Sequence, residues 1–130
     1  MIFGIGTDIC KVSRFLDKVC DIENQNSFIT RYFNSKEIKK DFATASLAAQ
    51  YYASRFAAKE AFSKALGTGI RDFCVKDVYV TKDEKGKPIL NVENTCLMQL
   101  QKIVKNYKIH LSLSHEKEFA QAFVVIEQIM

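Results

Sequence analysis

The chain has 130 residues, of which 48% are hydrophobic and 26% charged, and its formal net charge is +4. This length predicts one domain over residues 1–130, large enough to bury a hydrophobic core. The composition excludes a membrane-spanning protein, since no apolar run approaches the roughly 20 residues that cross a bilayer.

The start of the chain and its charge limit where the protein acts and on what. The N-terminus lacks a basic segment and reaches Asp8 too early for a secretory signal, so a cytoplasmic location is expected. The mild positive charge suits an acidic partner or a phosphorylated substrate. No motif typical of nucleic-acid binding is present, and we expect neither a nucleic-acid nor a membrane partner.

The cysteines do not predict a metal centre. They form no C-x-x-C pair, and the chain has only two histidines, whereas a structural zinc site needs closely spaced ligand pairs. We therefore expect buried free thiols in a reducing compartment. The four cysteines are Cys10, Cys20, Cys74 and Cys96.

The first third of the chain predicts a strand followed by short helices. Residues 2–9 form an apolar strand pattern, and residues 11–20 carry apolar side chains at helical spacing. Residues 24–34 indicate a loop or a short helix. Asn34, with Glu37 three residues later, resembles a capping box that could start another short helix.

Residues 46–66 predict the longest helix, which ends before Gly67, a residue favoured just past a helix end. Glu60 and Lys64 lie one turn apart on it, in an order that stabilises helices by roughly 0.2–0.5 kcal/mol. A carboxylate and an amine so placed could also hold a divalent metal and a phosphate together. Asp8, at the end of the Gly-rich first strand, is a second acidic candidate for such a site.

The second half of the chain predicts strands around one further helix, for which Asn94 is a candidate N-cap. The predicted elements are a strand over 75–82, a turn over 83–86, a strand over 89–92, a helix over 94–107 and a hairpin of strands 108–114 and 119–127. This order predicts an α+β fold, in which a mainly antiparallel sheet packs with one long and several shorter helices.

The last strands leave one polar feature open to two interpretations. His110, Ser112 and Ser114 alternate with apolar residues and share one face, which is either a solvated sheet surface or a polar wall facing a ligand. No G-x-S-x-G, phosphate-binding loop or dinucleotide fingerprint is present. Phosphate binding would therefore depend on side chains and a metal.

Several motifs, in this order, resemble those of the bacterial holo-[acyl carrier protein] synthases. They are Gly4-Ile-Gly-Thr-Asp8, Arg55-Phe-Ala-Ala-Lys-Glu-Ala-Phe-Ser-Lys-Ala65, Gly67-Thr-Gly69, Gly86-Lys-Pro88 and His110-Leu-Ser-Leu-Ser-His115. The resemblance implies a 4′-phosphopantetheinyl transferase-like fold. It also implies transfer of 4′-phosphopantetheine from coenzyme A to a serine of apo acyl carrier protein, with adenosine 3′,5′-bisphosphate as by-product. The expected context is fatty acid biosynthesis, and similar proteins are magnesium-dependent homotrimers with each active site between two subunits.

The resemblance also implies roles for individual residues. Asp8 and Glu60 match metal-binding carboxylates for Mg²⁺, with Mn²⁺ as the alternative, and Glu60 and Lys64 are the expected catalytic residues. Whether Glu60 or an acid of the carrier protein takes the serine proton stays open. Arg14 and Lys18 are expected to dock the acidic carrier. The expected coenzyme A contacts are Arg55, Lys59, Lys64, Gly86, Lys87, Pro88 and His110.

The chain departs from the family pattern in three places. Lys11 replaces a residue that is usually acidic, and Ser54 stands where glycine commonly precedes Arg55. The basic residues often found ahead of the long helix are absent from residues 44–53. In similar proteins they help to hold the 3′-phosphate from a neighbouring subunit, so the residues that do so here stay open.

Two other classes of function also fit parts of this pattern. A non-enzymatic module that binds an acidic partner would tolerate loss of Asp8 and Glu60. A different magnesium-dependent nucleotide enzyme would bind pyrophosphate without modifying a carrier protein.

Overall fold

The computed structural model describes residues 1–22, 27–69 and 75–130 and has an α+β fold, as the sequence predicts. Its helical segments are η1 (Val12–Phe15), α1 (Leu16–Cys20), α2 (Phe28–Tyr32), α3 (Ala45–Leu66), η3 (Val75–Asp77) and α4 (Asn94–Ile103). Its strands are β1 (Ile2–Lys11), β2 (Val78–Lys82), β3 (Pro88–Val92), β4 (Tyr107–His115) and β5 (Phe119–Gln128).

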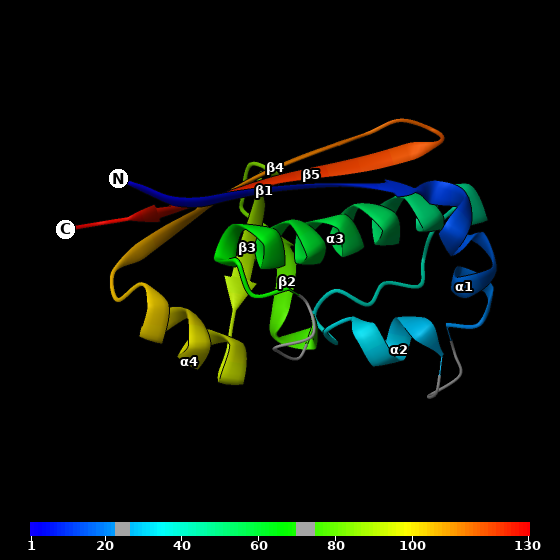
Figure 1. Ribbon diagram of the computed structural model, residues 1–130. Helices are drawn as coiled ribbons and strands as arrows, with labels where there is room; N and C mark the ends of the chain where they lie inside the picture. Colours follow the sequence, from blue (N-terminus) through cyan, green and yellow to red (C-terminus); the bar gives the residue numbers. More distant parts are fainter. Residues whose placement is uncertain (23–26, 70–74) are drawn as a thin grey trace.

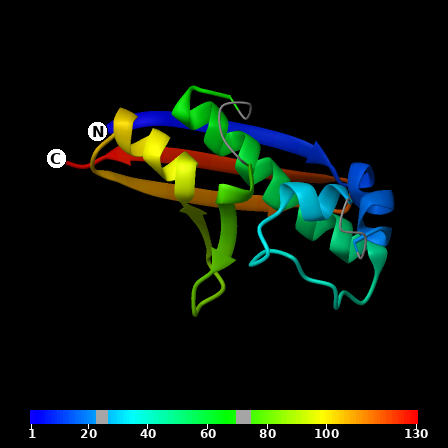
Figure 2. The same ribbon diagram turned by 90° about the horizontal axis from the view of Figure 1, so that it is seen from below.

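The long helix α3 lies across one face of an antiparallel sheet with strand order β1-β5-β4 (Figures 1 and 2). The short helices α1 and α2 lie on the side of α3 away from the sheet, while β2 and β3 form a separate hairpin (Figure 1). Most of α3 is therefore buried between two layers. No helix in the described ranges is long and apolar enough to cross a membrane.

Glycines on β1 bring the strand unusually close to α3. A Cβ atom at Gly4 would overlap the carbonyl oxygen of Ala65, and one at Gly6 would overlap that of Ala61. The helix presents small alanines at this contact, so backbone meets backbone. The Gly-rich pattern of the first strand thus sets the distance between Asp8 and the helix.

Replacing Gly6 with alanine is expected to lower the free energy of unfolding by about 1–3 kcal/mol or more, because overpacking forces the backbones apart. Urea unfolding measures this loss. Ser112→Ala, on the exposed face of β4, is the control and should change stability by about 0.5 kcal/mol or less. A Gly6→Ala protein as stable as the control would contradict the close packing.

The predicted helix over 11–20 is wrong in its bounds. β1 continues through Lys11, whose backbone is extended, and the N–H of Val12 donates to the carbonyl of Glu118 at 2.9 Å. This hydrogen bond ties the chain to the start of β5, so only a 3₁₀ turn and the five-residue α1 follow.

The short helix predicted within residues 24–34 and the capping box predicted at Asn34 had different outcomes. The short helix is confirmed as α2, whose N-cap Ser27 accepts from the N–H of Thr30 at 3.2 Å, although residues 23–26 lie outside the described part of the chain. The hydrogen bond from the Asn34 N–H to Glu37 Oε1 forms at 3.1 Å, but only a turn follows. The Glu37 carboxylate is fully buried in the core, where it pairs with Lys59.

The second half of the chain required smaller corrections. The strand predicted over 75–82 begins at Val78, after the turn η3, and the helix predicted to reach 107 ends at Ile103. Asn94 does not cap α4: its φ is +55°, and its side-chain amide donates to Asp77 Oδ1 at 3.1 Å. The predicted strand near 89–92 and the final hairpin are confirmed.

Candidate active site

Asp8 and Lys64 meet where β1 packs against α3. Asp8 lies two residues beyond Gly6 on the strand face that contacts the helix. Lys64 Nζ donates to Asp8 Oδ1 at 3.1 Å and to the carbonyl of Thr7 at 2.9 Å. The side chains of Asp8 and Lys64 are 21% and 54% exposed, so this centre is open to a ligand.

Glu60 adds a second carboxylate, one helical turn before Lys64. Burial raises the pKa of Glu60, and the nearby charge of Asp8 raises it further, while Lys64 and Arg14 oppose the shift. Asp8, Glu60 and Lys64 therefore interact at one half-buried site. The sequence motifs from two distant segments are brought together as expected.

These donors fit a divalent cation that arrives with a phosphorylated substrate. Mg²⁺ prefers oxygen ligands and is often held by one or two carboxylates plus phosphate oxygens and water. Within residues 1–22, 27–69 and 75–130 no three His, Cys, Asp or Glu side chains gather into a closed metal site. The pair Asp8 and Glu60 thus suits Mg²⁺ or Mn²⁺ and leaves positions for substrate oxygens.

Arg14 and Lys18 extend from this centre along η1 and α1. Arg14 Nη1 lies 3.8 Å from Cys10 Sγ, and the guanidinium lies 5.9 Å from the centre of the Phe56 ring. Lys18 Nζ donates to the carbonyl of Arg14 at 2.9 Å and lies 5.1 Å from the Phe28 ring centre. The two cations form a basic strip beside the carboxylates.

The hairpin turn and His110 form a second group. Asp83 Oδ1 accepts from the N–H groups of Lys85 and Lys87, both at 2.9 Å, which fixes the turn at Gly86 with its φ of +84°. Beside this turn is a cleft of about 320 Å³. It is lined by Asp83, Lys87, Pro88, Ile89, Leu90, Lys108, Ile109, His110 and Leu111.

His110 is anchored at the rim of this cleft. Its Nε2 lies 2.8 Å from Glu127 Oε1, and this hydrogen bond lowers the pKa of the Glu127 carboxyl. The predicted polar stripe is exposed, with Ser112 and Ser114 beside His110 on the sheet face away from α3. Asp8 faces α3, so within one chain the Asp8 and His110 side chains lie on opposite faces of the sheet, while the cleft itself lies at the β4 edge, where Ile109 and Leu111 also line it.

Two of the predicted coenzyme A contacts lie elsewhere. Lys59 is fully buried, and its ammonium pairs with Glu37 Oε1 at 2.7 Å and donates to the carbonyls of Val75 and Val78. Its face of α3 points into the core, so its contact with the donor stays a prediction. Arg55 is also buried and lines a separate pocket of about 300 Å³, and its contact with the donor likewise stays a prediction.

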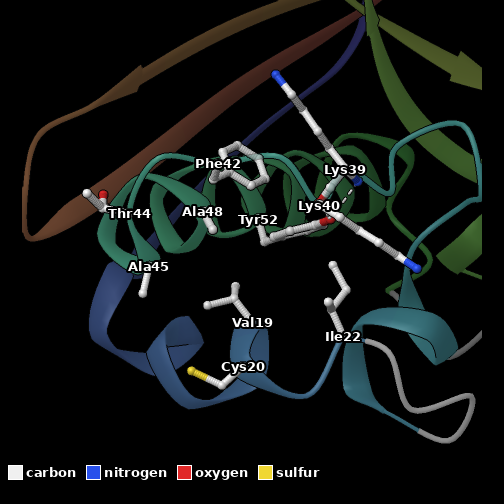
Figure 3. Close-up of a pocket in the computed structure, with 10 residues that line it drawn as sticks. All are labelled: Val19, Cys20, Ile22, Lys39, Lys40, Phe42, Thr44, Ala45, Ala48 and Tyr52. Atoms are coloured by element: carbon white, nitrogen blue, oxygen red, sulfur yellow. Dashed lines mark hydrogen bonds between the residues drawn. The ribbon is translucent and has the colours of Figure 1, made fainter.

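A further cavity of about 160 Å³ lies between α1 and the N-terminal half of α3, outside every predicted site. Val19 points from α1 toward the helix, while the ammonium groups of Lys39 and Lys40 extend in different directions (Figure 3). The buried free thiols expected from the sequence are present at Cys10 and Cys96, but the prediction is wrong for Cys20, which is free and exposed on α1. Cys74 lies outside the described residues.

Comparison with known proteins assigns the chain to a family. The model of the 4′-phosphopantetheinyl transferase superfamily matches residues 4–124. The holo-[acyl-carrier-protein] synthase of Clostridium beijerinckii is 42% identical over 129 residues, covering 99% of this chain and 100% of that protein. That of Treponema denticola is 44% identical over 127 residues, covering 98% and 99%.

Solved structures agree in fold. The crystal structure of a holo-(acyl-carrier-protein) synthase from Bacillus anthracis in complex with CoA (3′,5′-ADP) superimposes with a TM-score of 0.78, at 39% identity and 99% coverage of both chains. The chain belongs to the 4′-phosphopantetheinyl transferase superfamily. The predicted resemblance to the holo-[acyl-carrier-protein] synthases within that class of enzymes is confirmed over nearly its whole length.

Proposed function

We propose that this chain transfers the 4′-phosphopantetheine group of coenzyme A to a serine hydroxyl of apo acyl carrier protein, in service of fatty acid biosynthesis. The observation that carries the proposal is the meeting of Asp8, Glu60 and Lys64 at one open site. The family match and the coenzyme A-bound relative support it.

The reaction replaces a phosphoanhydride bond by a phosphoester bond. The serine oxygen bonds to the phosphorus next to pantetheine, the pyrophosphate P–O bond breaks, and adenosine 3′,5′-bisphosphate leaves. Asp8 and Glu60 would hold Mg²⁺ or Mn²⁺, which when bound offsets the charge of the pyrophosphate. Lys64 would leave Asp8 to stabilise the negative charge on the leaving group. The serine proton passes to a base, either Glu60 or an acidic residue of the carrier.

The adenosine end of the donor is assigned to the second group. Lys87, Pro88 and His110 line a cleft large enough to accept part of a nucleotide, and Gly86 lies in the turn directly before Lys87. Because His110 and Asp8 lie on opposite sheet faces, a donor that reaches both would contact two subunits. This is the reason to propose a homotrimer with shared active sites.

The outer face of the sheet is a candidate subunit contact. Ile5, Ile9 and Phe123 are 58%, 63% and 43% exposed on this face, where β1 and β5 are neighbours. Light scattering of the purified chain should give three times the 14.8 kDa protomer mass. Phe123→Lys should dissociate the assembly because it buries a charge, whereas Met98→Lys on α4 should not. A monomeric unmodified chain would contradict the proposal.

Carrier recognition is assigned to Arg14 and Lys18. Arg14 lies near the Glu60 carboxylate, and Lys18 is held against the Arg14 carbonyl, so an acidic carrier docked on them would bring its serine toward the donor pyrophosphate. Their exposed charges would act mainly on the association rate, with an effect that weakens as salt is added.

The test is to mix the purified chain with coenzyme A, Mg²⁺ and apo acyl carrier protein, and to weigh the carrier by mass spectrometry. A gain of one phosphopantetheine that disappears with a chelator is expected. Coenzyme A binding without any gain on several carriers would favour a different nucleotide enzyme. Neither binding nor gain would overturn the proposal.

A further inference from the structure

The Asp8 carboxylate is already paired with a cation of its own chain. Lys64 Nζ donates to Asp8 Oδ1 at 3.1 Å and to the carbonyl of Thr7 at 2.9 Å. Because the Asp8 side chain is only 21% exposed, its charge would be costly without a partner. Among residues 1–22, 27–69 and 75–130, Lys64 is the one ion-pair partner of Asp8. The ammonium thus contacts the carboxylate to which the proposed function assigns a divalent metal.

Glu60, the second proposed metal ligand, is different. In the described part of the chain its carboxylate forms no hydrogen bond or ion pair, although it lies close enough to Asp8 for their charges to interact. A metal could therefore reach Glu60 directly, whereas at Asp8 it would meet an ammonium. Two cations at such short range repel each other, so contact of one with Asp8 weakens the contact of the other.

Exposure distinguishes Lys64 from the other paired lysine of α3. Lys59 and Glu37 are both 0% exposed and 2.7 Å apart, so a ligand from solution reaches neither. The Lys64 side chain is 54% exposed, and both of its acceptors lie on β1. Its ammonium ends a flexible four-carbon stem and can move into water or onto a ligand without becoming a buried, unpaired charge.

Asp8, by contrast, is held in place. It pairs with Ala122 of β5, and Gly4 and Gly6 bring the same strand into backbone contact with α3. The carboxylate therefore cannot follow the ammonium when Lys64 moves. It then needs another cation, and carboxylate oxygens are ligands that Mg²⁺ and Mn²⁺ prefer.

We propose that Lys64 competes with the metal for Asp8, and that it moves to the phosphates of the donor when the two cations exchange. This inference rests on the proposed function and adds a link between its two ligands. A metal that binds alone displaces Lys64 and gives it no new partner. When coenzyme A binds as well, a phosphate oxygen accepts from the displaced ammonium. Metal affinity is therefore low without the donor and higher with it, and the effect is reciprocal.

Mn²⁺ binding to the purified protein, followed by the loss of the EPR signal of free Mn²⁺, tests the competition without carrier or transfer. Without coenzyme A, Lys64→Gln should bind Mn²⁺ about tenfold more tightly than the unmodified chain, because it removes one charge-assisted contact to Asp8. Lys64→Arg keeps a cation that can pair with Asp8, so it should bind Mn²⁺ as weakly as the unmodified chain.

Two further variants separate this competition from a general change in charge. Arg14→Gln removes an exposed cation that acts on Glu60, and it should tighten Mn²⁺ binding about twofold or less. In an Asp8→Asn chain, Lys64→Gln should no longer tighten Mn²⁺ binding, since the shared carboxylate is gone. Equal tightening by Arg14→Gln and Lys64→Gln, or no tightening in a folded Lys64→Gln protein, would overturn the proposal.

The same titrations at saturating coenzyme A test the link to the donor. The unmodified chain should bind Mn²⁺ at least about tenfold more tightly with coenzyme A than without it, and this ratio should be about tenfold smaller in Lys64→Gln. An equal ratio in the two proteins would contradict the link. A chain that neither binds coenzyme A nor modifies a carrier would refute the proposed function, while the titrations with Mn²⁺ alone would still decide whether Lys64 competes for Asp8.

Discussion

Glu60→Gln and Lys64→Gln are each expected to reduce phosphopantetheine transfer at least about 100-fold while the protein stays folded. Glutamine keeps the size of Glu60 but removes the charge that would hold the divalent ion beside Asp8. At Lys64 it removes the ammonium that would face the developing charge of the leaving group. The rate is measured as carrier mass gained per minute at saturating coenzyme A and Mg²⁺.

The controls separate loss of chemistry from loss of structure. Both side chains are partly or largely exposed, so the urea midpoint of each variant should stay close to that of the unmodified chain. Glu84→Gln and Lys102→Gln make the same chemical changes at exposed positions outside the site and should transfer normally. A folded Glu60→Gln or Lys64→Gln protein that transfers phosphopantetheine at the normal rate would contradict the role assigned to that residue.

The sequence predicts this centre well because its parts are strongly patterned. The apolar first strand and the long run 46–66 identify a strand and a helix, and the i,i+4 spacing puts Glu60 and Lys64 on one helix face. What brings Asp8 to that face is the close contact at Gly4 and Gly6. The sequence shows these glycines, but it does not show that they pack against the long helix, because that contact depends on the tertiary fold.

Lys59 shows what the sequence pattern leaves out. It directly precedes Glu60, yet neighbouring residues on a helix point about 100° apart, because one turn holds 3.6 residues. The motif therefore mixes a residue of the open site with a residue of the core. Only the position of Glu37, 22 residues earlier, distinguishes the two, and that contact depends on tertiary packing.

The Asn34–Glu37 hydrogen bond of the predicted capping box forms, but the helix expected after it does not, again because of a tertiary contact. Glu37 does reach the N–H of Asn34, as the local pattern requires, but its second oxygen accepts from the N–H of Val80 at 3.0 Å. The carboxylate thus links the segment before α3 to the helix and to β2. The local sequence pattern includes only the Asn34 partner of Glu37, so it predicts a helix where the structure has a turn.

Lys59→Met should therefore lower the free energy of unfolding by about 3–5 kcal/mol, because it leaves the fully buried Glu37 carboxylate without its counter-charge. Urea unfolding measures the loss. Lys36→Met, which breaks the exposed pair with Glu93, is the control and should cost about 1 kcal/mol or less.

The same variant decides between the two roles of Lys59. If the ammonium only supports the core, the folded fraction of Lys59→Met should bind coenzyme A with unchanged affinity, since none of its described contacts lies at Asp8 or at the His110 cleft. If it contacted the donor, affinity would fall about tenfold with little loss of stability. The second result would return Lys59 to the active site and would mean that the buried pair opens when the donor binds.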